Sequence, residues 1–453
     1  MTGSRPTPAR PSEPSPLSNL DPDIPVQIEA KLLEELNTRL SGEQTNGGNG
    51  WASTRRQAAG AFEQMGLPGK RSEAYKYTPM TRRVTDLLSL ENAAAPVSAP
   101  TVFGNVDGIH LYTTNGLLDS VPASLPAGLT IASLSNAHAD NPGFVNENLS
   151  RAFVANRDAF SSLAAASADD GILIHVSADT TVDAPIVIHH DQVAASGLVQ
   201  PRILVVVDSN ARLQLVEHLG EAGASSAFEN RVAEMIVAEG GWMDHVLVYE
   251  RGLDNTFVNG LHVYQEGTSH FATNTITLGG GMVRNNLHFL PDGEECETHL
   301  NGLYIARGSM HIDNHTFVDH AKPNCESNEL FKGIVADKAT GVFNGKILVR
   351  QDSQKINAYQ SSKSIVLDRS ASIYAKPELE IYADDVKCSH GATTGELDEE
   401  ALFYLRARGI NPTMARLLLL EAFARDVVDL IGHEPVREYL YSRLHSLLET
   451  HAS

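Results

Sequence analysis

The chain has 453 residues, of which 42% are hydrophobic and 20% charged, so it is long enough for a large core and two or three structural regions. Its formal net charge of −21 disfavours binding to nucleic acid and to anionic lipid, because both require clustered cations. No apolar run approaches the roughly 20 residues that span a bilayer. We therefore expect a globular protein with no nucleic acid and no membrane among its partners.

The N-terminal segment, residues 1–24, is rich in Pro, Ser and Thr and contains no apolar stretch like the core of a secretory signal. This composition predicts a disordered tail. The whole chain has three cysteines, an odd and sparse set without a CxxC pair, which fits a reducing compartment better than a disulfide framework. We expect a cytoplasmic location.

An N-terminal helical region is predicted over residues 25–95. The segment IEAKLLEELNTRL, residues 28–40, repeats apolar side chains at near-helical spacing. The Gly- and Asn-rich segment 41–50 is expected to end this helix, and a second helix is expected over about 52–65. The segment ENAAAPVSAP, residues 91–100, has the composition of a linker.

Residues 100–393 are predicted to be mainly β. Short apolar runs such as GILIHV, APIVIHH, RILVVVD and DHVLVYE recur, many of their residues are β-branched, and turn residues separate them. No helical stretch of 12 or more residues is evident between about 170 and 390, which excludes a doubly wound α/β domain. A sandwich, a propeller and a β-helix remain possible. Repeats of one short strand and a small polar turn favour the β-helix, although no strict repeat is visible.

Residues 394–453 are predicted to form a C-terminal helical domain. Asp398 can cap a helix that Gly409 ends, and the Asn-Pro pair at 411–412 can start the next helix. A last amphipathic helix follows. Residues 417–420 are four consecutive leucines, so part of this helical surface is a candidate for contact with a partner.

The segment KCSH places Cys388 and His390 two residues apart in a stretch that reads as extended. Residues i and i+2 of a strand share one face, so the two side chains are expected to project together. Thiolate and imidazole suit iron or zinc, although an isolated C-x-H pair is also common as a purely structural feature. A closed zinc site or an iron–sulfur cluster usually needs four ligands. We therefore interpret the pair as half of a site that a second chain completes.

Other histidines and cysteines are weaker candidates for metal ligation. His315, His320 and Cys325 lie at intervals of five, and odd intervals alternate between the faces of a strand, so these side chains are not expected to converge. Cys296 and His299 resemble a C-x2-H half site, for which an ordinary turn in an acidic stretch is the alternative. The segment GVFNGKIL has too few residues between its glycines for a phosphate-binding loop and lacks Ser or Thr after Lys, so no nucleotide site is predicted.

Three long segments carry a family resemblance. They read DNHTFVDHAKPNCESNELFKGI, GVFNGKILVRQDSQKINAYQSSKSIVL and KPELEIYADDVKCSHGATTGELDEEALFYLRARGI. They resemble the SufB/SufD family, whose members are scaffolds of the SUF iron–sulfur cluster assembly system, most densely over about residues 280–430. The segment GLPGKRSEAYKYTP is similar to a SufD-type segment of that family, with Tyr75 at the position of the usual Trp. The KCSHGAT segment points to the SufD branch.

The resemblance implies a right-handed parallel β-helix between N-terminal and C-terminal helical regions. It also implies a complex with a SufB-type paralogue, joined β-helix end to end, and with a SufC-type ATPase. In this complex His390, together with the adjacent Cys388, would take part in assembling a nascent cluster at the junction. The cofactor would be a transient iron–sulfur cluster or iron shared with the partner.

The C-terminal helices would be the docking surface for SufC. We name Phe403, Tyr404, Leu418 and Phe423 as docking residues. ATP would be bound and hydrolysed by SufC, which leaves this chain as a non-catalytic scaffold subunit that binds no nucleotide.

Two alternatives remain at this point. The first is a carbohydrate-active β-helix enzyme using Asp384 and Asp385, although adjacent residues of a strand point to opposite faces. The second is a purely structural partner of SufB and SufC, in which Cys388 and His390 would be core residues.

Overall fold

The computed structural model describes residues 24–45, 51–69, 72–88, 102–104, 106–191, 197–220 and 227–451. The tail predicted over residues 1–24 lies outside the described residues except for Ile24, and the predicted linker lies outside them entirely.

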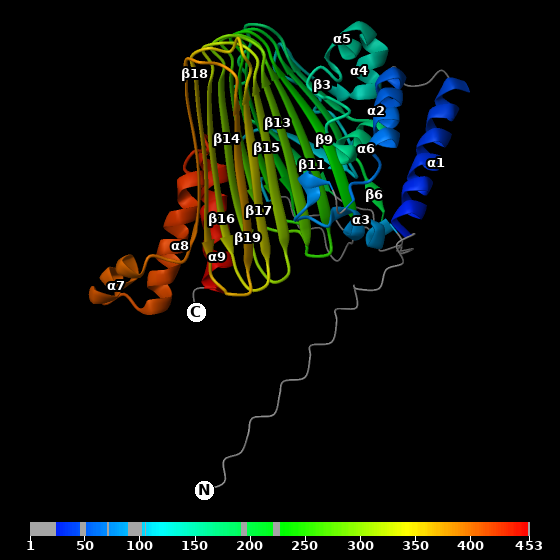
Figure 1. Ribbon diagram of the computed structural model, residues 1–453. Helices are drawn as coiled ribbons and strands as arrows, with labels where there is room; N and C mark the ends of the chain where they lie inside the picture. Colours follow the sequence, from blue (N-terminus) through cyan, green and yellow to red (C-terminus); the bar gives the residue numbers. More distant parts are fainter. Residues whose placement is uncertain are drawn as a thin grey trace.

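Two long sheets dominate the described chain (Figure 1). Sheet A contains, in spatial order, β2 (Leu117–Leu118), β1 (Ile109–Thr114), β5 (Ile186–Asp191), β8 (Arg212–Leu219), β10 (Trp242–Tyr249), β12 (His270–Thr277), β14 (Glu297–Ala306), β16 (Glu326–Val335), β18 (Ile356–Val366) and β20 (Val386–Gly395). Sheet B contains β19 (Ser372–Ile381), β17 (Thr340–Val349), β15 (His311–His320), β13 (Met282–Pro291), β11 (Thr256–Gln265), β9 (Phe228–Val237), β7 (Arg202–Val207), β4 (Ile172–Val176) and β3 (Leu129–Ser133). The short β6 (Leu198–Val199) pairs with β9.

From β7 to β20 successive strands go alternately to the two sheets, and from β9 onward each strand pairs in parallel with the strand two places earlier. The chain therefore winds as a parallel β-helix, which confirms the predicted fold class. Polar side chains that stack on neighbouring coils are 26, 29 and 31 residues apart in the sequence. This variable coil length explains why no strict repeat was visible.

The interior of the β-helix holds one apolar cluster contributed by both sheets. Alternate residues of each strand enter it, for example Leu213 and Leu215 of β8 and Ala233 and Met235 of β9. Because side chains of parallel strands in register stack on one another, each coil buries its apolar residues against the next coil.

Helices cover the outer face of sheet B near the start of the β-helix. The N-terminal helices are α1 (Ile24–Thr45), α2 (Ala52–Met65) and α3 (Met80–Leu88), with a 3-10 turn at Glu73–Tyr75. The helix α2 has the predicted bounds, whereas α1 continues past its predicted end. Three short helices, α4 (Leu134–Asp140), α5 (Pro142–Asn148) and α6 (Ala159–Ser167), lie between β3 and β4, within the range that the sequence predicts to be β.

A second apolar cluster holds these helices in place. Phe62 of α2 and Phe160 of α6 are buried against Phe228 and Val232 of β9. Figure 1 shows the N-terminal helices beside β9 and β11, at the end of the molecule opposite the last strands.

The C-terminal helices are α7 (Glu399–Ala407), α8 (Pro412–Val428) and α9 (Glu434–Glu449). Their boundaries follow the predicted signals: Asp398 accepts hydrogen bonds from the backbone of α7, Gly409 has a φ of 86°, and Asn411 caps α8. The helices α8 and α9 bury a leucine-rich stripe against the outer face of sheet A. Among the described helices, none has the length and apolar character that crossing a bilayer requires.

Candidate functional site

The last coil of the β-helix is open on one side. In the part of the chain that the structure describes, β20 pairs only with β18 and β19 only with β17. Most residues of β20 are exposed, in contrast to the buried strands at the centre of the solenoid. An unpaired strand edge offers a row of backbone donors and acceptors to another chain. This end is therefore a candidate docking edge.

Cys388 and His390 lie on this edge strand. Cys388 is half-buried and packs against the interior apolar cluster, in register with Ala358 of β18. Burial raises the pKa of the Cys388 thiol, and a backbone hydrogen bond with Ala358 partly opposes this effect. His390 is exposed, and it pairs in register with Gln360 of the neighbouring strand β18. An added Cβ at Gly391 would meet no atom, so there is open space beside the histidine.

The pair offers one thiol and one imidazole, an incomplete ligand set. Among the described residues, neither Cys388 nor His390 belongs to a group of three ligand atoms close enough to share one ion. A stable iron or zinc centre here would need further ligands from outside these residues. Cys388 and His390 therefore form a candidate half of a metal or cluster site.

Behind His390, a polar row that we call the end row lies inside the last coils. It consists of Thr316, Glu329 and Gln360. Thr316 Oγ1 donates to Glu329 Oε2 at 2.7 Å, and Gln360 Nε2 donates to the same oxygen at 3.2 Å. Glu329 is buried, and desolvation raises its pKa to about 7 despite these two hydrogen bonds. Gln360 is the register partner of His390, so the end row reaches the open edge.

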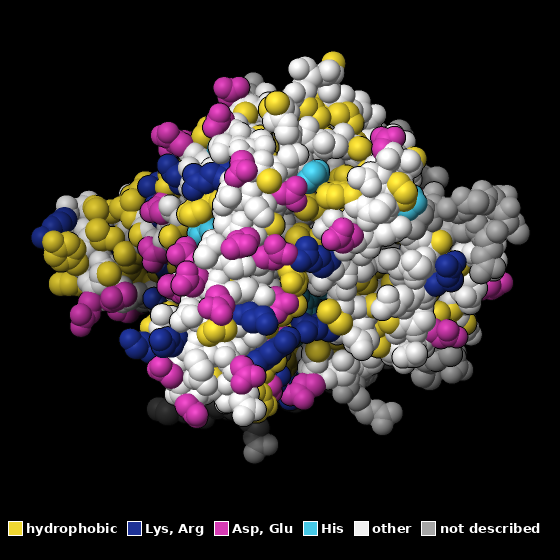
Figure 2. Space-filling model, turned by 90° about the horizontal axis from the view of Figure 1, so that it is seen from above, with side chains coloured by type: hydrophobic (Ala, Val, Ile, Leu, Met, Phe, Trp, Pro, Cys, Tyr) yellow, Lys and Arg dark blue, Asp and Glu magenta, His cyan; other side chains and the backbone are white. Residues whose placement is uncertain are grey.

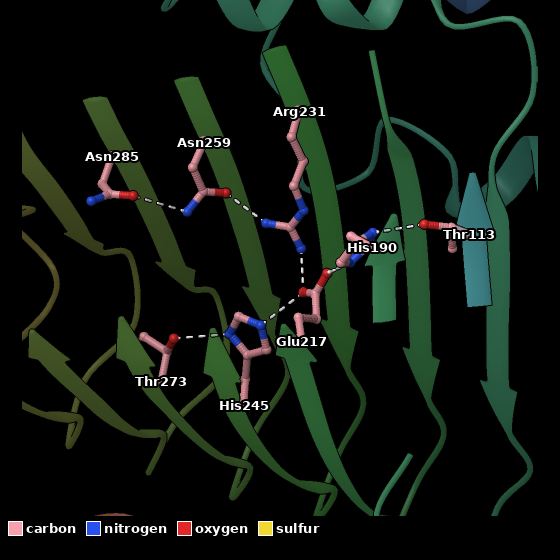
Figure 3. Close-up of polar contacts among 8 residues, drawn as sticks. All are labelled: Thr113, His190, Glu217, Arg231, His245, Asn259, Thr273 and Asn285. Carbon is pink, nitrogen blue, oxygen red and sulfur yellow. Dashed lines mark hydrogen bonds and ion pairs between the residues drawn. The ribbon is translucent and has the colours of Figure 1, made fainter. Parts of the chain in front are cut away.

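A charged network lies deeper in the interior (Figure 3). Glu217 of β8 is fully buried and forms an ion pair with Arg231 of β9. His190 and His245 each place a ring nitrogen 2.9 Å from a Glu217 oxygen. Burial alone would raise the pKa of Glu217, but Arg231 and the two histidines hold it well below its ordinary value. The carboxylate is therefore charged and paired inside the β-helix.

The network continues along sheet B as a ladder of amides. Arg231 donates to Asn259, Asn259 donates to Asn285 at 3.3 Å, and Asn285 donates to Asn314 at 2.8 Å. Two residues after Asn314 on the same strand comes Thr316 of the end row. Sequence reasoning missed these polar residues, since alternation only indicates that a strand position faces inward. The available signal was the similar spacing of the three asparagines.

The weaker ligand candidates do not form metal sites among themselves. Cys296 and Cys325 are both buried inside the β-helix and both donate to Gly293 O, at 3.3 and 3.1 Å. His299 is on the outer face of sheet A, so the C-x2-H half site is not formed. His315 contacts Asp313, whereas His320 contacts Ser327 in the interior, so the predicted alternation of faces separates these two histidines.

Two of the predicted docking residues lie on α7 and two on α8. Phe403 is 73% exposed and Tyr404 is 55% exposed, and Leu418 is also exposed. Phe423 is only partly exposed and packs against the sheet, where Lys332 lies over its ring. Hydrophobic side chains gather on the protruding lobe at the left of Figure 2. Three of the four predicted docking residues are therefore exposed, Phe403 and Tyr404 on α7 and Leu418 on α8.

Comparison with known proteins identifies the family of the chain. The model for the SufBD core domain of the SUF iron–sulfur cluster assembly system matches residues 189–423, and the model for the SufBD N-terminal region matches residues 48–188. A SufBD family protein of Synechocystis sp. is 31% identical over 393 residues, which is 83% of this chain and 86% of that protein.

Two further relatives extend this comparison. The iron–sulfur cluster assembly protein SufD of Escherichia coli is 28% identical over 84% of this chain and 89% of its own length. The chloroplastic protein ABCI7 of Arabidopsis thaliana is 28% identical over 77% of this chain and 74% of its own length. The chain therefore belongs to the SufB/SufD family of iron–sulfur cluster assembly proteins. Within that family it is SufD-like.

Proposed function

We propose that this chain is a non-catalytic scaffold subunit that assembles nascent iron–sulfur clusters at a junction with a SufB-type paralogue. One observation carries the proposal. The unpaired edge strand β20 presents Cys388 and His390, an incomplete thiol–imidazole set, at the open end of the β-helix. Family membership favours this assembly role over the carbohydrate-active alternative.

The SufB-type partner would dock on the open end. A second parallel β-helix can add its terminal strand to β20, which would satisfy the free backbone groups and continue the stack of coils. This arrangement would bring ligands of the partner next to Cys388 and His390. The cluster, or the iron that precedes it, would then be cargo held by both chains rather than a resident cofactor of either.

The SufC-type ATPase would dock on the C-terminal helices. The projecting surface of α7 and α8 is apolar where Phe403, Tyr404 and Leu418 lie, which suits burial against another protein. ATP would be bound and hydrolysed by that partner, since the sequence here lacks a phosphate-binding loop. The three free cysteines fit a reducing compartment, and we propose the cytoplasm.

Co-expression with the SufB-type and SufC-type partners tests the cluster site. The purified complex is assayed for iron and acid-labile sulfide in the wild type, His390→Ala and Ser389→Ala. Ser389 is the matched control because it lies on the same exposed strand but on the opposite face. We expect loss of most cluster in His390→Ala with an intact complex, and normal content in Ser389→Ala. Normal content in His390→Ala would leave only the purely structural role.

Docking of the ATPase is tested separately. In Phe403→Ala/Tyr404→Ala, co-purification of the SufC-type partner should fall while the SufB-type partner is retained. Leu253→Ala removes another exposed apolar side chain, in the loop between β10 and β11 rather than on α7 or α8, and should leave both partners bound. If the double variant retains the ATPase at wild-type stoichiometry, the proposed docking surface is wrong.

A further inference from the structure

A cluster of two histidines and one glutamate lies on the outer face of sheet A, away from the strand that carries His390. We call it the His270 cluster, and it consists of His270, Glu297 and His299. In parallel register His270 pairs with Glu297, and His299 is two residues further along the same strand. The neighbours Phe271 and Thr298 point into the interior, so alternation directs the three cluster side chains outward.

The three ligand atoms of this cluster lie within 4.8 Å of one another. His270 Nδ1 is 3.2 Å from Glu297 Oε2. Zinc binds imidazole nitrogen and carboxylate oxygen at about 2.0–2.2 Å, so two ligands of one ion are separated by roughly 3–4 Å. Small side-chain rotations would therefore bring all three atoms onto a single ion.

Neighbouring side chains already fix the orientation of the His270 ring. Trp242 stacks on it with the ring centroids 3.6 Å apart and the planes at 13°. Arg212 lies 4.5 Å over the Trp242 ring, and Trp242 Nε1 donates to Asp244 at 3.0 Å. Such packing fixes the imidazole before any ion arrives, which lowers the entropic cost of binding.

Asp244 also faces the other nitrogen of this ring. Its carboxylate lies 3.8 Å from His270 Nε2, while Nδ1 faces Glu297. This separation is too long for a hydrogen bond, so Asp244 acts on the ring as a nearby negative charge and through Trp242, which it holds by a hydrogen bond. A simple ion pair between His270 and Glu297 would not explain why His299 and Asp244 also lie beside the His270 ring.

We propose that His270, Glu297 and His299 bind one divalent transition-metal ion of the zinc or ferrous class. Two imidazoles and one carboxylate suit these borderline ions, whereas Mg²⁺ and Ca²⁺ prefer sets made only of oxygen. Glu297 is exposed and both histidines are partly exposed, so the ion can enter from solvent and keeps a free coordination position. This site is distinct from the candidate half site at Cys388 and His390.

The test uses Co²⁺ as a probe on the full-length chain. The chain contains two tryptophans, Trp51 and Trp242, and Trp242 lies against the ligand ring, so a bound paramagnetic ion should quench its fluorescence. We expect saturable quenching and a cobalt absorption band at one equivalent. Zn²⁺ and Fe²⁺, added without oxygen, should displace the probe, whereas excess Mg²⁺ should not.

Variants decide whether the named residues form the site. Glu297→Gln and His299→Asn should each weaken Co²⁺ binding by at least tenfold, and Asp244→Asn should weaken it by a smaller factor, because Asp244 lies 3.8 Å from His270 Nε2 and does not ligate. His445→Ala is the matched control, because His445 contacts Glu421 in an exposed pair outside the cluster and should not affect binding. The double variant Cys388→Ser/His390→Ala should retain the site, which separates this proposal from the proposed function.

Two results would overturn the inference. One is an absence of saturable Co²⁺ binding by the wild type. The other is equal affinity in the wild type, Glu297→Gln and His299→Asn, which would mean that the ion binds elsewhere. Circular dichroism of each variant verifies that the β-helix is folded, so that lost binding reports on the ligands.

Discussion

Replacing Glu329 by Gln is expected to stabilise the protein at alkaline pH. Glu329 is buried in the end row, where Thr316 and Gln360 both donate to one of its oxygens. No cation is among the groups that shift its pKa, and burial raises that pKa from 4.5 to about 7. The carboxyl group is therefore protonated in the folded protein under mildly acidic conditions and ionised above neutrality.

The magnitude follows from linkage between proton binding and folding. Between about pH 4.5 and pH 7 the folded state holds a proton on Glu329 that the unfolded state has lost, so stability falls as the pH rises through this window. Each unit of pKa corresponds to about 1.4 kcal/mol, so the full loss is about 3 kcal/mol. Gln keeps the shape and the acceptor oxygen but does not ionise.

The assay is urea unfolding of the wild type and Glu329→Gln at several pH values between about 4 and 8. The difference in unfolding free energy should grow with pH by about 3 kcal/mol in favour of the variant. Taking the difference cancels groups that titrate identically in both proteins. A difference that stays constant across this range would refute the assignment of a raised pKa to Glu329.

Three other predictions concern local features of the fold. Native-state alkylation, followed by mass spectrometry, should label Cys388 in preference to the buried Cys296 and Cys325. Because burial raises the pKa of the Cys388 thiol, the labelling rate should rise about tenfold per pH unit through neutrality. A labelling rate that does not depend on pH would contradict this. Gly302→Ala would place a Cβ 2.2 Å from the Phe331 ring and should cost about 1–3 kcal/mol in urea unfolding, whereas Gly391→Ala, which meets no atom, should cost little. Asp398→Ala should remove the cap of α7, costing about 1 kcal/mol locally, and hydrogen exchange that remains slow in α7 would argue against the cap.

Local signals explain why the C-terminal helices could be placed from sequence. A cap such as Asp398 or Asn411 acts on backbone groups within three residues of itself, and Gly409 adopts its positive φ whatever lies far away in the chain. These determinants are fully contained in short segments. Short apolar runs separated by turns predicted a mainly β region over nearly 300 residues and only favoured a β-helix over a sandwich or a propeller, and the family resemblance then implied the β-helix.

The polar interior was not predictable in the same way. Alternation assigns Glu217 and Arg231 to inward positions, but it cannot reveal that they face each other, because they lie in different sheets. The His270 cluster depends on the register of two strands 27 residues apart. The sequence indicated only Cys296 with His299, but Cys296 precedes β14 and is buried in the interior, whereas His299 is on the outer face of that strand. Coil lengths that vary from 26 to 32 residues hide this register.

The unpaired edge at β20 has a consequence for the isolated chain as well as for the site. When no other chain covers β20, its free backbone N–H and C=O groups can pair with an exposed strand of another molecule. Copies of the chain whose β20 edge stays uncovered are therefore expected to aggregate with one another through this strand.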